Sequence, residues 1–473
     1  MLGERRKSDA GASTPSGSPA FSSWPSRRND RRIAQMKNHH LHALHAIRHF
    51  LRTRSSYDVL PVSFRLVVLD TKLTIKSALD VMFQSGVVSA PLWRSTLSDD
   101  EQTERPRNEA YSSRADGRPG FSGMITVHDI IHLIQYYYLT ASNYVSASLD
   151  VETLRLERLR EIEETLKVPP PPLLWIAPLR SLAEAGELLV RTHARRIPLL
   201  DYDEDLGVET VVSVLTQYRL LKFIAMNCHE TSGLRASIGS LGIGTYTYEH
   251  IRKRRQRTPL ARLKMGAPPP PDAGPYWPIQ TASLNTPVSD IVHIFSEKGI
   301  SAVPILDEDG DVVDIYESVD VITLVRTGAY YQLDLTIQQA LERRPADYVG
   351  VSCCSSQDSL ADVFAQLKTR RMHRMLVLDD EPDSSHSSSA SLPAPSRRDS
   401  TTSMEEEGLR TRPKGKLVGL LCLSDILRYI IGNPTAQAQP PVPSPLSNAV
   451  LPTVGESIPA TEPSTAPEPS AHP

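Results

Sequence analysis

The chain has 473 residues, too many for one hydrophobic core, which predicts two or more domains. Its formal net charge is −3, which excludes a strong general attraction to nucleic acid or to an anionic membrane. Hydrophobic residues make up 40% of the chain and could build a core, but 38 prolines stand against 8 phenylalanines and 4 tryptophans, which indicates sizeable unstructured segments.

No apolar run approaches the length of a membrane span, and the first residues, MLGERRKSDA, have no apolar signal core behind their charges. The four cysteines are Cys228, Cys353, Cys354 and Cys422, and none has metal-ligand spacing. We therefore expect a reduced protein of the cytoplasm and nucleus, without a membrane partner and without a bound metal.

Residues 1–50 are predicted to form a disordered basic arm with a short helix. Lys and Arg outnumber Asp and Glu by eight within residues 1–55, so the arm could direct nuclear import or bind phosphate. A disordered tail with neither role is the favoured interpretation. His45 and His49 lie one helical turn apart, but they have no acidic or cysteine partner nearby, so we expect no metal there.

A pattern of helix, strand, strand and helix then recurs four times, which indicates a repeat architecture. The second half of each copy reads as an apolar strand followed by an amphipathic helix, at 121–134, 211–224, 311–325 and 417–430. The first half reads as a helix followed by a short strand, at 77–93, 181–201, 288–309 and 359–380. Pro91, Pro198 and Pro304 occupy one column of this alignment, and Leu376 replaces proline in the fourth copy.

The predicted domain bounds are repeat 1 at 56–141, repeat 2 at 170–228, repeat 3 at 278–328 and repeat 4 at 346–432. Polar or low-complexity insertions interrupt repeat 1 at 94–120 and repeat 4 at 382–413. A charged amphipathic helix at 149–168 is predicted to bridge repeats 1 and 2. The connector at 229–277 holds a basic and proline-rich insertion, and the tail at 433–473 is predicted to be disordered.

The place where strand meets helix carries the chemistry. Asp129, Asp320 and Asp425 hold this place in repeats 1, 3 and 4, where a carboxylate can cap the helix or accept from the two hydroxyls of a ribose. Arg219 holds it in repeat 2 and cannot accept a hydrogen bond.

Basic groups stand just before the second strand of the even repeats only. These positions are Arg195 and Arg196 in repeat 2 and His373 and Arg374 in repeat 4, against Val88 and Ser89 in repeat 1 and Ser301 and Ala302 in repeat 3. Ordinary surface charge is the alternative for each one alone. Their matching columns favour contact with phosphate.

The repeats resemble cystathionine-β-synthase (CBS) domains, small α/β modules that pair and bind adenine nucleotides. Four in a row, with the segments 56–73, 90–93, 211–223 and 423–427, resemble the γ subunit of the AMP-activated, sucrose-nonfermenting-type protein kinase, in its fungal form. The resemblance implies two Bateman-type pairs, 1 with 2 and 3 with 4, in a flattened disk. It also implies AMP, ADP and ATP as regulatory ligands and the kinase α and β subunits as partners.

The resemblance carries over residue by residue. For the site of Asp425 it implies Thr245, Ser301, Ala302, Cys422 and Ser424. For site 1, the site of Asp129, it implies Thr126 and His128 beside Asp129, with His373 and Arg374 on the phosphate. Site 3, the site of Asp320, departs from the family: a serine, an arginine and a lysine are replaced by Glu317, Val88 and Tyr218. We therefore expect Asp320 to hold nucleotide weakly or not at all. The site of Arg219 should be empty.

Motifs of catalysis are absent from the sequence, including phosphate-binding glycine loops, kinase catalytic motifs and nucleophile elbows. A non-catalytic, nucleotide-sensing regulatory subunit is therefore the first hypothesis. A structural scaffold with vestigial nucleotide sites is the rival. A nucleic-acid-binding protein that uses the basic arm and residues 252–257 is the least favoured, because the net charge is close to zero.

Overall fold

The computed structural model describes residues 26–61, 65–95, 119–140, 153–203, 208–256, 276–326, 334–344, 348, 350–379 and 415–432. The first 25 residues of the arm, most of the three insertions and the tail at 433–473 lie outside these ranges. Within them, no helix is both long enough and apolar enough to cross a membrane.

All four repeats form a small sheet with two helices. Repeat 1 contains β1 (Leu69–Asp70), α2 (Ile75–Gln84), β2 (Ala90–Arg94), β3 (Gly120–Ile125) and α3 (Val127–Thr140). Repeat 2 contains α6 (Leu182–Arg191), β4 (Arg196–Asp203), β5 (Val208–Thr216) and α7 (Gln217–Asn227). Repeat 3 contains α10 (Val288–Lys298), β7 (Ala302–Leu306), β8 (Val312–Glu317) and α11 (Ser318–Arg326). Repeat 4 contains β9 (Cys353–Ser355), α13 (Leu360–Thr369), β10 (Arg374–Leu378), β11 (Leu417–Cys422) and α14 (Leu423–Ile431).

The sheets repeat the same register. In each repeat the two long strands run antiparallel, and a parallel partner precedes them: β1 in repeat 1, β9 in repeat 4, and single bridges at Ile176 and Ala282 in repeats 2 and 3. Every antiparallel pair has an irregularity one residue after the column that holds Pro91, Pro198, Pro304 and Leu376. The shared irregularity supports the alignment of the four copies.

The helices begin where short polar side chains can cap them. Thr74, Ser181 and Ser359 each accept a hydrogen bond from the backbone N–H three residues on, at the start of α2, α6 and α13. These caps end the turn that follows the first strand and fix the point at which the buried face of each helix starts.

The connectors carry the remaining elements. They are α1 (Ser26–Thr53), η1 (Ser56–Val59), η2 (Leu156–Arg158), α5 (Leu159–Thr165), η3 (His229–Gly233), α8 (Ile238–Leu241), β6 (Thr245–Tyr246), α9 (Tyr248–Gln256) and α12 (Ile337–Leu341). Two predictions need correction here. The helix of the arm is not short but has 28 residues. The predicted helix at 149–168 is not continuous: its first four residues lie outside the described ranges, and from Leu156 on it is a 3-10 turn followed by the seven-residue α5.

The core shows how the repeats pack. Sheets join repeat 1 to repeat 2 through a cluster around Phe121 and Val211, and repeat 3 to repeat 4 through a cluster around Ile315 and Leu376. Helices join repeat 1 to repeat 3 and repeat 2 to repeat 4. One large apolar cluster contains residues of repeats 1 and 3, and the other contains residues of repeats 2 and 4 together with α1. The predicted pairing is thus present in the sheets, and a second pairing crosses it.

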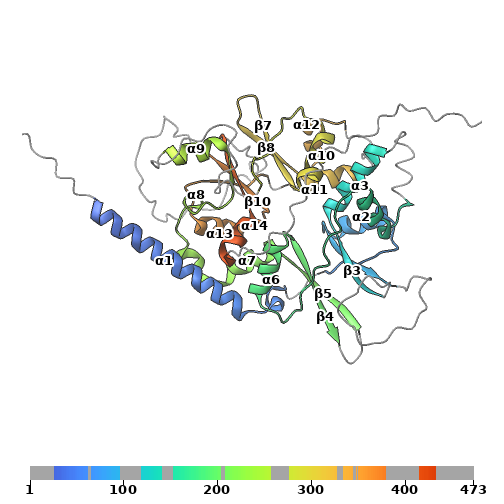
Figure 1. The fold of residues 1–473 in the computed structure, drawn as a ribbon, viewed down its shortest axis with the longest axis horizontal. Helices are drawn as coiled ribbons and strands as arrows, with labels where there is room; N and C mark the ends of the chain where they lie inside the picture. The colour runs from blue at the N-terminus through green and yellow to red at the C-terminus, as the bar shows by residue number, and fades with distance from the viewer. Residues whose placement is uncertain are drawn as a thin grey trace, which may run out of the picture.

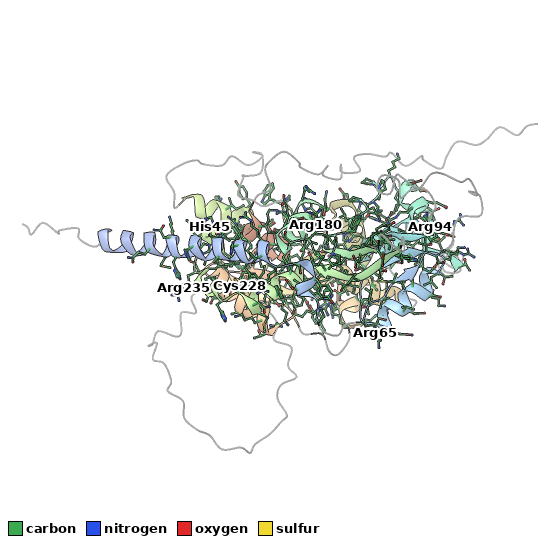
Figure 2. All side chains as sticks on the ribbon, turned by 90° about the horizontal axis from the view of Figure 1, so that it is seen from below. His45, Arg65, Arg94, Arg180, Cys228 and Arg235 are labelled. Carbon is green, nitrogen blue, oxygen red and sulfur yellow. The ribbon has the colours of Figure 1, made fainter. Side chains whose placement is uncertain are left out.

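This packing gives the flattened body that the fold class predicted. The four repeats surround the middle of the molecule in Figure 1, and α1 extends beyond them at one side. Figure 2 shows the same body edge-on and much thinner, with His45 and Cys228 near α1 and Arg94 at the opposite end. The predicted α/β class, with four modules in a flattened body, is confirmed.

Candidate functional site

One central cavity collects most of the predicted site residues. Its volume is about 1300 Å³, and side chains from all four repeats line it. Twelve of the fourteen predicted residues are in its wall: Thr126, His128, Asp129, Arg195, Arg196, Thr245, Ser301, Ala302, His373, Arg374, Cys422 and Ser424. The other two, Asp320 and Asp425, lie behind the wall. A cavity of this size and polarity can hold drug-sized ligands.

The carboxylate of Asp425 is built into the start of α14. It is 6% exposed, and its Oδ2 accepts a hydrogen bond of 2.9 Å from the backbone N–H of Cys422. Arg428, one turn later, is 3.6 Å from Oδ1. Burial raises the pKa of Asp425 to about 6, although the Cys422 N–H and Arg428 oppose this. The carboxylate therefore has capacity left for further hydrogen-bond donors.

The small residues predicted around Asp425 come from separate elements. Cys422 and Ser424 flank it on β11 and α14. Thr245 lies on β6, which pairs with β11 beside Leu420, and it is buried. Ser301 and Ala302 come from repeat 3 and also line the cavity. Burial raises the pKa of the Cys422 thiol to about 12, so this side chain is a neutral thiol at pH 7.

Asp129 occupies the same place in α3, but its surroundings differ. Its Oδ2 accepts from the backbone N–H of Thr126 at 2.5 Å, and Oδ1 is 3.4 Å from Arg160 Nη1. Arg160 also pairs with Glu163, which faces His132 at 3.5 Å. Burial, and then the neighbouring Glu163, raise the pKa of Asp129 to about 6.

Sequence reasoning missed Arg160, Glu163 and His132, although all three line the cavity. Arg160 and Glu163 lie on α5, in the region that the sequence predicted only as a bridging helix. Their spacing of three residues is that of one helix face, and no pattern in the chain linked this face to repeat 1.

Two of the four histidines that line the cavity, His128 and His373, are neutral near pH 7. Burial, and then the charge of Arg195, lower the pKa of His128 to about 3. The pKa of His373 is lowered to about 4. Burial is the main cause, Arg374 and Arg371 add to it, and the negative charge of Glu317 opposes it. The sequence counted His373 as phosphate-binding charge. The structure leaves it as a hydrogen-bonding group without charge near pH 7.

Arg374 already has partners in the cavity. Its Nε is 3.1 Å from Glu317 Oε1, and its Nη2 donates to Ser301 Oγ at 3.1 Å. Glu317 belongs to repeat 3, so this ion pair crosses from repeat 3 to repeat 4. An incoming anion must compete with Glu317 for this guanidinium.

Asp320 does not face the cavity and is held by an arginine of the chain. Arg344 donates from Nε to Oδ1 at 2.8 Å and from Nη2 to Oδ2 at 2.7 Å. It also donates to Asp314 at 2.9 Å and to the carbonyl oxygen of Ile315. The Arg344 side chain is only 3% exposed. This bidentate pair uses the carboxylate, which gives a physical reason to expect weak nucleotide binding or none at Asp320, a reason that the sequence did not show.

In repeat 2 the structure uses a different cap. The Thr216 side chain accepts a hydrogen bond from the backbone N–H of Arg219 at 3.0 Å. In the other three repeats a carboxylate at the position of Arg219 accepts from a backbone N–H instead. Arg219 Nη1 donates to the carbonyl oxygen of Val214 at 2.9 Å, and its side chain lines the cavity. No group of three or more His, Cys, Asp or Glu residues in the described ranges could hold a metal ion.

Comparisons with known proteins are in keeping with this geometry. A family model described as "CBS domain" matches residues 276–326. The chain is 35% identical over 389 residues to a Saccharomyces cerevisiae protein named 5'-AMP-activated protein kinase subunit gamma, covering 82% of this chain and 94% of that one. A Kluyveromyces lactis protein of the same name is 34% identical over 390 residues, covering 82% and 92%. A solved protein of Methanocaldococcus jannaschii is 13% identical with a TM-score of 0.48, covering 80% and 99%.

Proposed function

The chain belongs to the family of γ subunits of 5'-AMP-activated protein kinase, and from this premise we propose a specific function for it. It is the non-catalytic regulatory subunit of a heterotrimeric, energy-sensing Ser/Thr kinase. Its central cavity binds AMP, ADP or ATP, and occupancy alters the activity of a catalytic α subunit held with a β subunit. The complex works in the cytoplasm and nucleus.

The observation that carries the proposal is a pair of buried carboxylates, Asp129 in the cavity wall and Asp425 directly behind it. Asp129 and Asp425 each accept one backbone N–H and stand at the third residue of a helix. A ribose diol offers two donors to such a carboxylate. Low exposure strengthens the resulting hydrogen bonds, because little water competes for the oxygens.

Phosphate groups would meet the basic wall of the cavity. Arg195 and Arg196 come from repeat 2 and Arg374 from repeat 4, so a ligand held by Asp129 reaches cations of other repeats. His373, being neutral, can donate one hydrogen bond, whereas the N–H of His128 already donates to the backbone carbonyl of Ile300. Binding across repeats links ligand occupancy to their relative positions, which is what coupling to a partner requires.

We assign nucleotide to the sites of Asp129 and Asp425 and not to those of Asp320 and Arg219. The Asp320 carboxylate is taken by Arg344, and Glu317 adds a negative charge near the phosphates. Arg219 has no acceptor to offer a ribose.

The test is calorimetric titration of the purified chain, or of its trimer, with AMP, ADP and ATP, using Asp425→Ala and Asp320→Ala side by side. Micromolar binding that is lost in Asp425→Ala and kept in Asp320→Ala supports the proposal. No heat with any nucleotide in the wild type contradicts it.

A scaffold without nucleotide sensing is the second candidate, and one observation favours it. Two of the charged groups predicted to serve ligands, Asp320 and Arg374, are already paired within the chain. The same titration decides, because a scaffold shows no nucleotide binding while the trimer still assembles.

A further inference from the structure

The wall of the cavity carries more positive charge than the proposed nucleotide sites use. Among the described residues, eight arginines and three carboxylates line it. Arg160, Arg374 and Arg428 have carboxylate partners within 4 Å. Three of the others, Arg196, Arg219 and Arg371, lie close enough to act on one another's pKa. Arg196 pairs with Thr216, whose side chain caps α7 at Arg219. The three arginines come from the start of β4, the first turn of α7 and the loop between α13 and β10.

A comparison with repeat 3 shows what this arginine group lacks. In repeat 3, Arg344 donates to the carbonyl of Ile315 and is neutralised by Asp320 and Asp314. In repeat 2, Arg219 donates to the carbonyl of Val214, which holds the same register position on β5 as Ile315 on β8. No described carboxylate lies within ion-pair distance of it.

The two acids of repeat 3 are replaced at matching positions in repeat 2. Arg219 itself stands at the helix position of Asp320. Ser213 stands at the strand position of Asp314, since both pair with the residue just before the irregularity of the facing strand. Ser213 is fully buried, lines the cavity, and its Oγ has no hydrogen-bond partner among the described residues. Repeat 2 thus has the guanidinium of the repeat 3 arrangement without the anions.

The position of Arg219 is itself unfavourable without an anion. It is the third residue of α7, whose first turn has no acidic residue, and a cation there opposes the positive end of the helix dipole. Burial chiefly, and then the charges of Arg195, Arg371 and Arg219, lower the pKa of Arg196 to about 10, so repulsion within the group adds to the cost of burying this charge. An anion bound between these side chains removes both penalties.

We propose that the repeat 2 side of the cavity is an anion site for a diphosphate group, held by Arg196, Arg219 and Arg371. It needs no ribose acceptor and shares only Arg196 with the proposed nucleotide sites, so its binding of a free anion can be tested apart from them. Its occupant is either a free pyrophosphate-type anion or the terminal phosphates of a nucleotide that Asp129 or Asp425 anchors.

The experiment is calorimetric titration of the full chain with sodium pyrophosphate at fixed low salt. Arg219→Gln and Arg371→Gln should each weaken binding about tenfold, because each removes a charge-assisted contact. Arg219→Lys should restore most of it. Arg191→Gln, an exposed arginine of α6 outside the cavity, is the matched control and should bind like the wild type.

Two further titrations are needed. One distinguishes a free anion from the terminal phosphates of a nucleotide, and the other distinguishes failure of this inference from failure of the proposed function. ATP binding that weakens in Arg219→Gln while AMP binding does not assigns the site to terminal phosphates, and unchanged ATP binding assigns it to a free anion. The Asp129→Ala, Asp425→Ala double variant should keep its affinity for pyrophosphate. The inference is overturned if the wild type does not bind pyrophosphate, if the Gln variants bind it normally, or if the double Asp variant loses it. Loss of nucleotide binding alone affects only the proposed function.

Discussion

At the scale of single residues, Arg344 is the most constrained cation in the described part of the chain. It lies over the ring of Tyr348 at 4.2 Å and bonds two carboxylates and a carbonyl while almost fully buried. Arg344→Met would leave Asp314 and Asp320 without a counter-charge in a poorly solvated place. We expect a loss of about 3–5 kcal/mol in the free energy of unfolding, measured by urea denaturation.

The matched control is Arg180→Met. Arg180 is in an exposed ion pair with Glu184 at 3.6 Å, where solvent screens the charges, so the expected change is below about 0.5 kcal/mol. Adding Asp320→Asn to Arg344→Met should recover part of the loss. Equal effects of the Arg344 and Arg180 substitutions would show that the Arg344 contacts do not stabilise the fold.

Asp425 predicts a dependence of stability on pH. Its pKa is about 6 in the folded chain against 3.8 as the ordinary value, so the folded state binds the proton more tightly. The stabilisation from this group is therefore complete below pH 3.8 and is lost as the pH rises through 6. Asp425→Asn keeps an oxygen for the Cys422 N–H but removes the charge.

We therefore expect the stability of Asp425→Asn relative to the wild type to be greater at pH 7 than at pH 5, by about 1 kcal/mol. Urea denaturation of both proteins at the two pH values measures this. A difference that does not change with pH, or changes in the other direction, contradicts the assignment. Nucleotide binding at this site should weaken as the pH falls below 6, because the neutral acid accepts less well.

The sequence predicted those site residues that occupy equivalent positions in the four repeats. Asp129, Arg196, Arg374 and Asp425 stand in aligned columns, and the columns meet at one cavity because every repeat presents the same end of its sheet. Glu163 and Arg344 could not be found this way. They belong to connectors that follow repeats 1 and 3, and their pairing with Asp129 and Asp320 depends on packing that no spacing encodes.

At the scale of elements, α1 holds the far end of the helix that carries Asp425. Arg48 Nε donates to the carbonyl oxygen of Ile430 at 2.6 Å, and Nη2 donates to that of Tyr429 at 3.3 Å. These carbonyls belong to the last turn of α14 and lack partners within the helix. Arg48→Met should lower the free energy of unfolding by about 1–3 kcal/mol and increase hydrogen exchange in the last turn of α14. Arg52→Met, in the exposed last turn of α1, serves as control and should leave that exchange unchanged.

The lengths of two helices escaped sequence reasoning for physical reasons. The Ser- and Pro-rich composition that predicts disorder ends at residue 25. Residues 26–37 contain good helix formers and no Gly or Pro, so the helix begins there and not near residue 39. In the bridging segment, the N–H of Ile75 bonds the carbonyl of Leu154, and the N–H of Leu156 bonds that of Leu73. These bonds hold the backbone extended beside repeat 1, so α5 begins only after Arg158.

At the scale of the whole molecule, the two large apolar clusters divide the chain differently from its sheets. Phe364 of α13 is in the cluster of repeats 2 and 4, and Phe295 of α10 is in the cluster of repeats 1 and 3. Both are buried, and truncation of either side chain to Ala should lower the free energy of unfolding by about 3–5 kcal/mol. The two variants should differ in which helices lose protection from hydrogen exchange.

We expect Phe364→Ala to increase hydrogen exchange in α6 and α7 of repeat 2 together with α13 and α14, while α3 keeps its protection. Phe295→Ala should do the reverse, with α3 affected and α7 spared. If exchange in Phe364→Ala rises in repeats 3 and 4 only, the sheets and not the helices define the cooperative units.

The cross-wise core also bears on how the chain is made. The apolar faces of α1, α6 and α7 are complete once Asn227 has been synthesised, yet the residues of repeat 4 in the same cluster begin only at Cys354. Roughly 130 residues must be added in between, which takes on the order of ten seconds at typical rates of translation. During that time the nascent chain carries an apolar surface that repeat 4 does not yet cover, so we expect chaperones that bind such surfaces to raise the yield of folded chain.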